Sequence, residues 1–88
     1  MKQIIFTDSF LKDMLQITNP RLEGAIFDTI GLLPYAPALG SRALPNSVRH
    51  AFGEEARKIS VPPFDIIYTV VNKDDFLILG LVHQRAAR

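Results

Sequence analysis

The chain has 88 residues, 48% of them hydrophobic, and a formal net charge of +1, so residues 1–88 are expected to form one domain. The near-neutral charge excludes a polycation that binds nucleic acids through charge alone. The lack of cysteine excludes disulfides and thiolate chemistry, and two histidines are too few for a zinc site built from protein ligands alone.

The N-terminal half is predicted to be a strand followed by two helices. Residues 3–6 are β-branched or aromatic, which indicates a strand. A first helix of about two turns follows over residues 10–15, where apolar side chains recur at helical spacing. Asn19 and Pro20 then supply an N-cap and a first helical residue. The second helix has one apolar face made of Leu22, Ala25, Ile26, Thr29, Ile30 and Leu33.

The C-terminal half is predicted to be mainly strands. Residues 47–52 alternate in polarity and give a weak strand signal, and residues 56–61 indicate a strand that ends at Pro62-Pro63. Residues 64–71 and 76–83 are the strongest strands, and the short turn between them makes them antiparallel neighbours. The predicted fold class is α+β, with an N-terminal strand, a two-helix hairpin and an antiparallel sheet of three to four strands.

The last two strands are apolar on both faces, although one helical hairpin can cover only one face. In the last strand, Leu77, Leu79 and Leu81 are predicted to share a face opposite Phe76, Ile78 and Val82. Large apolar patches are rarely left exposed on monomers, so we predict a partner on the uncovered face. The partner would bind Leu77, Leu79 and Leu81, or their neighbours Ile78 and Val82, depending on where the hairpin packs. Arg57 or Lys58 and Arg85 would pair with its acidic side chains.

The chain contains no general enzyme motif, and no metal or cofactor is expected. Arg57 and Lys58 are adjacent in a predicted strand and must point to opposite faces. They could be one solvated and one paired charge, or part of an electropositive face that holds phosphate. His83 and Arg85 follow a buried strand, where a histidine can titrate and an arginine can clamp an anion. The alternative for these two residues is a frayed polar terminus.

No segment has the features of a secretory signal, and the longest apolar run, residues 76–82, is far shorter than the ~20 residues that span a bilayer. We therefore expect a cytoplasmic protein without a membrane partner.

Five collinear segments resemble a known family. They are Ile5-Phe6-Thr7-Asp8-Ser9-Phe10, residues 33–41, residues 57–61, residues 64–68, and Ile78-Leu79-x-Leu81-Val82-His83-Gln84-Arg85. The aromatic-x-aliphatic-aliphatic-Tyr strand at residues 64–68 and the last strand closing on His-x-Arg are the most specific. Over about residues 3–86 the chain resembles the RelE/ParE toxin superfamily of type II toxin–antitoxin systems, which includes plasmid stabilisation toxins.

The resemblance implies a toxin that inhibits growth in one of two ways. RelE-like members are ribosome-dependent endoribonucleases that cut mRNA, and ParE-like members poison DNA gyrase. Both are held inactive by a cognate antitoxin, here in a complex that could be a heterotetramer, and the toxin could also form a homodimer. By position, the candidate catalytic residues are Arg57, Lys58, His83 and Arg85.

One residue departs from the ribonuclease pattern. Ribonuclease members often have Arg after the aromatic residue of the Tyr68 strand, where this chain has Asp65. A carboxylate there would repel a scissile phosphate. Asp65 therefore favours an alternative in which the chain is a catalytically inactive relative that only binds an antitoxin and regulates an operon.

Overall fold

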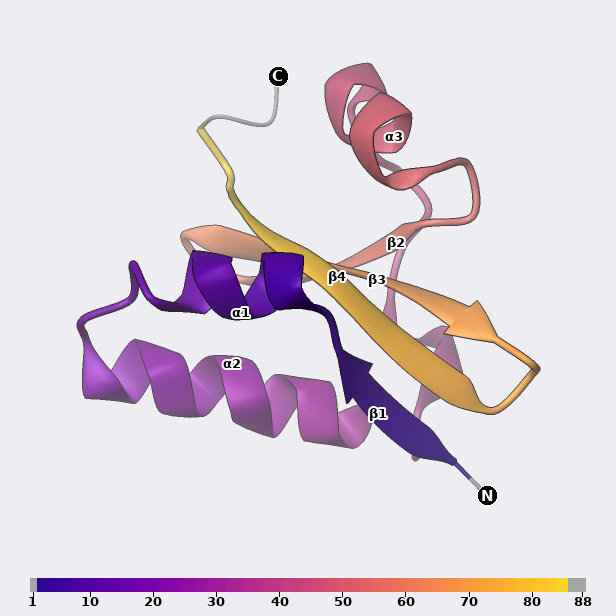
Figure 1. Ribbon diagram of the computed structural model, residues 1–88, viewed down its shortest axis with the longest axis horizontal. Coiled ribbons are helices and arrows are strands. Elements are labelled where there is room, and N and C mark those ends of the chain that lie inside the picture. Colours follow the sequence, from indigo (N-terminus) through magenta and orange to yellow (C-terminus); the bar gives the residue numbers. More distant parts are fainter. Residues whose placement is uncertain (1, 86–88) are drawn as a thin grey trace.

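The computed structural model describes residues 2–85 and folds a two-helix hairpin against one face of a four-stranded sheet (Figure 1). The elements are β1 (Gln3–Phe6), α1 (Asp8–Met14), α2 (Pro20–Leu32), the 3-10 turn η1 (Pro37–Leu39), α3 (Asn46–Phe52), β2 (Arg57–Val61), β3 (Phe64–Val71) and β4 (Asp75–His83). The strand order is β1-β4-β3-β2. The predicted α+β class is confirmed. The parallel pairing of β1 with β4, which the sequence did not predict, places the N-terminal strand beside the last one.

Thr7 connects β1 to α1 and fixes both to β4. Its backbone N–H and its hydroxyl both donate to the Ile78 carbonyl, at 3.2 and 2.8 Å. The same Oγ1 accepts from the Phe10 amide, which is the N-cap hydrogen bond of α1. Beyond β1, the Asp13 carboxylate of α1 accepts the Leu81 amide at 2.9 Å. The Asp13 side chain of the first helix therefore satisfies part of the β4 edge that β1 is too short to reach.

The second helix begins as its sequence predicts. The Asn19 side chain accepts from the amides of Arg21 and Leu22, and Pro20 is the first helical residue. Ile26, Ile30 and the following Leu33 are buried against the sheet. We call the sheet face beneath the helical hairpin the inner face. Its buried core consists of Phe10, Met14, Ile26, Ile30, Leu33, Ile59, Ile66, Tyr68, Phe76, Ile78 and Leu81.

A β-bulge in β4 changes which face its side chains occupy. Tyr68 pairs with Ile78, whereas the preceding Ile67 pairs with Gly80, so that Leu79 is an extra residue on β4. Side chains alternate normally up to the bulge and resume one step out of phase after it. The prediction that Leu77, Leu79 and Leu81 share one face is therefore wrong. Leu81 is buried in the inner core.

The opposite, outer face of the sheet is partly covered by the chain itself. Residues 47–52, predicted as a weak strand, lie instead in the helix α3, which packs above this face (Figure 1). Val48 and Phe52 are four residues apart and so share a helix face as well as a strand face, which makes so short a pattern ambiguous. The outer cluster contains Leu44, Val48, Ala56 and Ile67, with Phe52, Leu79 and Val82 packed against it.

We predict that the packing of α3 depends on the missing side chain of Gly80. A Cβ at Gly80 would lie 2.8 Å from two ring atoms of Phe52, which is too close without a shift of the ring. Gly80→Ala should therefore lower the free energy of unfolding by about 1 kcal/mol through overpacking. In a Phe52→Leu background the loss should be less than half as large. Urea unfolding of the four proteins measures this coupling. Equal losses in both backgrounds would show that Phe52 does not pack over Gly80.

Candidate functional site

The two adjacent basic residues of β2 occupy opposite faces of the sheet. Arg57 pairs with Tyr68 and alternates with Ile59, so it lies on the inner face, half-buried. Lys58 pairs with Ile67 and lies on the outer face. The two side chains therefore leave the strand in opposite directions. The structure thus does not bring Arg57 and Lys58 together.

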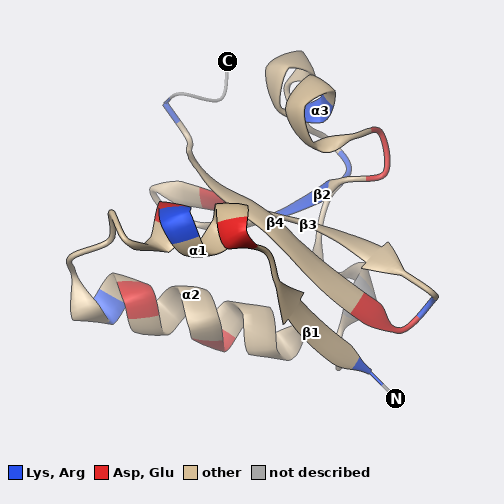
Figure 2. Cartoon of the chain, in the orientation of Figure 1, with Lys and Arg blue, Asp and Glu red and all other residues tan. Residues whose placement is uncertain are grey.

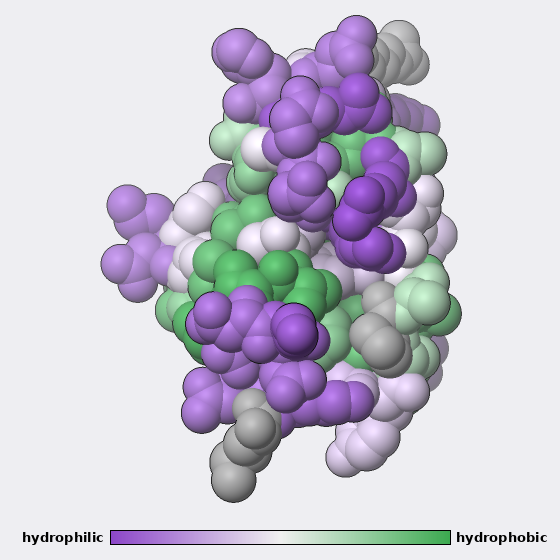
Figure 3. Space-filling view, turned by 90° about the vertical axis from the view of Figure 1, so that its right-hand side faces the viewer, coloured by the Kyte–Doolittle hydropathy of each residue, from purple (hydrophilic) through white to green (hydrophobic). Residues whose placement is uncertain are grey.

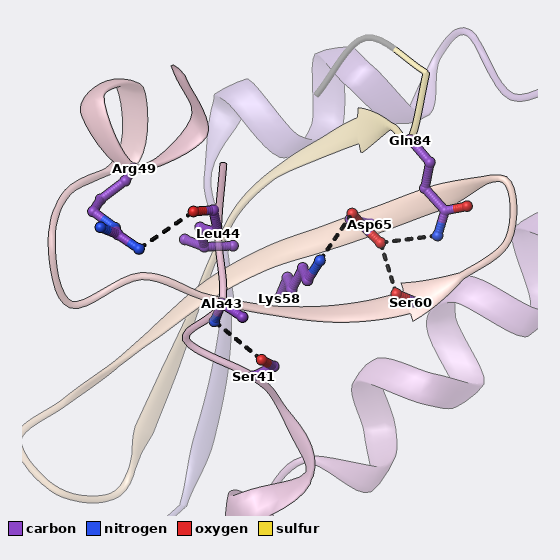
Figure 4. A network of polar contacts seen from close by, with 8 residues as sticks. All are labelled: Ser41, Ala43, Leu44, Arg49, Lys58, Ser60, Asp65 and Gln84. Atoms are coloured by element: carbon purple, nitrogen blue, oxygen red, sulfur yellow. Dashed lines mark hydrogen bonds and ion pairs between the residues drawn. The ribbon is translucent and has the colours of Figure 1, made fainter. Parts of the chain in front are cut away.

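Lys58 belongs to a polar network around Asp65 (Figure 4). The Asp65 residue is only 5% exposed, and its Oδ2 lies 4.0 Å from the Lys58 ammonium nitrogen. Its Oδ1 accepts from the Ser60 hydroxyl at 2.7 Å and from the Gln84 side-chain amide at 3.1 Å. The sequence left open whether Arg57 or Lys58 would be the paired charge, and it gave no indication of Ser60 or Gln84 as further partners of Asp65. Ser60 could have been found, because it alternates with Lys58 on the strand.

His83 and Arg85 lie at the end of β4, beyond the bulge. The His83 ring packs edge-on against Phe64, with centroids 5.2 Å apart, and Phe64 packs against the inner core. The His83 Nδ1 accepts the Arg85 backbone amide at 3.1 Å, so a neutral His83 carries its proton on Nε2. Phe64 pairs with Val61 of β2, four residues after Arg57. His83 is therefore level with Val61, about 13 Å along the sheet from Arg57 and two strands away from it.

Tyr68 is the only side chain within residues 2–85 with a buried polar atom that lacks a hydrogen-bond partner. Its hydroxyl lies against the Gly40 backbone, where a Cβ at residue 40 would collide with it. Burial raises the pKa of the Tyr68 phenol, while the positive charge of Arg57 and the Gly40 backbone act to lower it. Burial prevails, so the phenol is neutral and belongs to the core. The side chain of Arg57 is thus placed next to a structural tyrosine.

Charge is unevenly divided along the chain. Residues 42–65 together with Arg85 carry 5 basic and 3 acidic side chains, a net charge of 5 − 3 = +2. The other described residues carry 4 basic and 6 acidic side chains, a net charge of 4 − 6 = −2. The basic excess lies around α3, β2 and the end of β4 (Figure 2). Two of its members, Arg42 and Arg49, form exposed ion pairs with Glu55 and Glu54. Such pairs contribute little to stability.

The outer face is left open beyond α3. Ile5 and Leu77 are paired neighbours there, and neither belongs to the outer cluster beneath α3. Ile5 is 39% exposed and Leu77 is half-buried. We call this pair the open outer patch. Seen from the right-hand side of Figure 1, the molecule has an apolar area bordered by hydrophilic side chains (Figure 3). Of the three predicted partner-binding leucines, Leu77 is in the patch, Leu79 lies against the outer cluster and Leu81 is buried on the inner face.

The structure also has a cleft that none of the predicted site residues lines. It has a volume of about 380 Å³ and is lined by Lys2, Ile4, Gly31, Pro34 and Tyr35.

No group of three or more His, Asp or Glu side chains within residues 2–85 is placed to hold a metal ion. Within those residues no helix is long and apolar enough to cross a membrane.

Residues 4–88 match the family described as the ParE toxin of the type II toxin–antitoxin system parDE. The match covers nearly the whole sequence. The chain belongs to the ParE toxin family of type II toxin–antitoxin systems. No curated protein sequence gives a significant match to it.

Two solved structures have the fold of this ParE-family chain. One is in the RelBE2 toxin–antitoxin complex from Mycobacterium tuberculosis, with a TM-score of 0.73, 16% identity, and coverage of 93% of this chain and 96% of that one. The other is a conserved hypothetical protein from Helicobacter pylori, with a TM-score of 0.64, 17% identity and 98% coverage of both chains. At these identities the likeness extends to the fold alone.

The stability of this ParE-family protein should fall at high pH because of Tyr68. Its raised pKa means that the folded state keeps a proton that the unfolded chain releases as the pH rises past about 10. Between pH 9 and pH 11 the wild type should therefore lose more unfolding free energy than Tyr68→Phe, as measured by urea denaturation. Tyr35→Phe removes a phenol that is 87% exposed and should behave like the wild type. Parallel losses in the wild type and Tyr68→Phe would contradict the assignment.

Proposed function

We propose that this ParE-family chain inhibits growth by binding DNA gyrase and not by cleaving RNA. The observation that carries the proposal is the position of Arg57 and Lys58 on opposite faces of β2, with Lys58 beside the buried Asp65. Phosphodiester cleavage requires several donors that converge on one phosphate, where the transition state gains negative charge. The candidate set Arg57, Lys58, His83 and Arg85 is dispersed over two faces and two ends of the sheet.

Binding to a protein target does not require these residues to converge on one phosphate. A binding surface needs a few anchors at a fixed position and no proton-transfer geometry. The end of β4 offers His83, held against Phe64, and Arg85, whose side chain can pair with a carboxylate or phosphate. We assign the target contact to this end of the sheet, where Arg85 follows the last residue of β4 (Figure 2).

We further propose that the antitoxin contacts the open outer patch. Ile5 and Leu77 form the apolar area that α3 leaves uncovered, and a partner segment with apolar side chains would bury it. Leu79 would lie at the edge of that contact, whereas Leu81 would take no direct part because it is in the inner core. The complex would form in the cytoplasm.

Two substitutions separate gyrase binding from RNA cleavage. When the toxin is induced in a bacterium, Arg57→Ala should leave growth arrest within about threefold of the wild type, because Arg57 lies away from the end of β4. Arg85→Ala should abolish arrest. A catalytic role would instead cost Arg57→Ala about 10²–10³ in rate. Thermal unfolding of both variants checks that they are folded.

Pulse labelling in the same cells identifies the target. Gyrase binding predicts that DNA synthesis falls first, with trapped gyrase cleavage complexes, while protein synthesis continues. An immediate halt of protein synthesis would support the ribosome-dependent endoribonuclease instead. No effect on either process would support the inactive relative that only binds its antitoxin, the interpretation that Asp65 favoured in the sequence.

The antitoxin contact is tested by a matched pair of substitutions. Ile5→Glu should weaken binding of the cognate antitoxin at least tenfold, because it places a charge in the apolar contact. Val70→Glu is the control, since Val70 is 36% exposed and lies on the inner side of the sheet. Titration calorimetry with purified antitoxin gives both affinities. Equal affinities for the two variants would exclude the open outer patch as the binding face.

A further inference from the structure

The carboxylate of Asp65 joins three parts of the chain that are distant in sequence. It accepts from Ser60 of β2 and from Gln84 beyond β4, and it faces Lys58 of β2 (Figure 4). It is the only charged residue within residues 2–85 that is buried. All its polar contacts come from β2 and from the segment that leaves β4.

Burial alone does not explain a charge at this position. The outer-face neighbours of Asp65 on β3 and β4 are Ile67 and Val82, both part of or packed against the outer cluster. A buried charge carries a desolvation penalty, and apolar residues of similar size are often as stabilising or more so. A carboxylate, in contrast to an apolar side chain, fixes the direction of its donors. Its structural effect here is to orient Gln84.

Gln84 is held at two points, one just before β3 and one at the second residue of that strand. Its backbone N–H donates to the Pro63 carbonyl at 2.8 Å, and its side-chain amide donates to Asp65. Its neighbours His83 and Arg85 are joined to each other by the hydrogen bond from the Arg85 amide to His83 Nδ1. A fixed Gln84 therefore fixes the direction in which the chain leaves the sheet after His83, the last residue of β4, and continues to Arg85.

We propose that Asp65 is a positioning residue that clamps Gln84 and thereby presents His83 and Arg85 to the target. This inference rests on the proposed function, because it takes the end of β4 as the target contact. Lys58 and Ser60 serve the clamp by satisfying the buried carboxylate. The acidic residue found where an arginine was expected thus has a role in binding without touching the target.

The clamp can be broken and restored by exchanging its donor and acceptor. Gln84→Glu places a second carboxylate against Asp65, and the two repel each other. Asp65→Asn combined with Gln84→Glu restores a donor–acceptor pair, because the new amide at position 65 can donate to the new carboxylate at position 84. Gln16→Glu makes the same charge change at an exposed residue and is the control.

Two measurements test the clamp. One reports whether the segment is held, and the other reports whether the target is contacted. Trypsin cleavage after Arg85, seen by mass spectrometry as loss of residues 86–88, reports how firmly the segment is held. Growth arrest on induction reports target contact. Gln84→Glu should be cleaved at least tenfold faster and should arrest growth at least tenfold less. The double variant should return both values to within about threefold of the wild type, and Gln16→Glu should match the wild type. The single and double variants have the same sequence around Arg85, so their difference in cleavage reports geometry alone.

Each contrary result has a separate meaning. Equal cleavage of the wild type, Gln84→Glu and the double variant would show that Asp65 does not hold the segment, and would overturn the proposal. Faster cleavage with undiminished growth arrest would overturn it too, since the target would not depend on the clamped position. A wild type that arrests no growth would refute the proposed function and the target role of the clamp, while the cleavage rates would still decide whether the clamp exists.

Discussion

The β-bulge at Leu79 and Gly80 is the constraint on which the arrangement of this molecule depends. One extra residue in β4 reverses the alternation of every side chain that follows it. Leu81 turns into the inner core and His83 follows it onto Phe64. Gln84 turns the other way and reaches Asp65. Without the bulge, Gln84 would point away from Asp65, and the end of β4 would present a different set of side chains.

The bulge also makes room for the cover on the outer face. Gly80 leaves the space in which the Phe52 ring of α3 lies, and Leu79 packs against the same cluster. A chain of 88 residues has few residues outside the sheet with which to cover both of its faces. One hairpin covers the inner face, and one short helix covers part of the outer face. What remains, around Ile5 and Leu77, is the area we assign to the antitoxin.

The polar residues follow the same division between faces. Arg57 on the inner face lies by the neutral phenol of Tyr68, and Lys58 on the outer face lies by Asp65. Both basic residues of β2 are thus placed beside structural groups. This arrangement is a poor basis for phosphate chemistry, and for that reason we propose the end of β4 as the target contact of this ParE-family chain.

Sequence alone determined most of the elements, because their signals are local. The cap at Asn19, the apolar face of α2 and the turn between β3 and β4 depend on residues a few positions apart. It also supplied the family, through segments in a fixed order. Only the tertiary structure decided that residues 47–52 are a helix, because a six-residue pattern fits two periods. Only it revealed the bulge, since the shift depends on the pairing of Ile67 with Gly80 across strands. The bulge decides which face of the sheet each later residue of β4 occupies. For that reason the alternation of the sequence alone could not show that Leu81 lies in the inner core and not on a binding face.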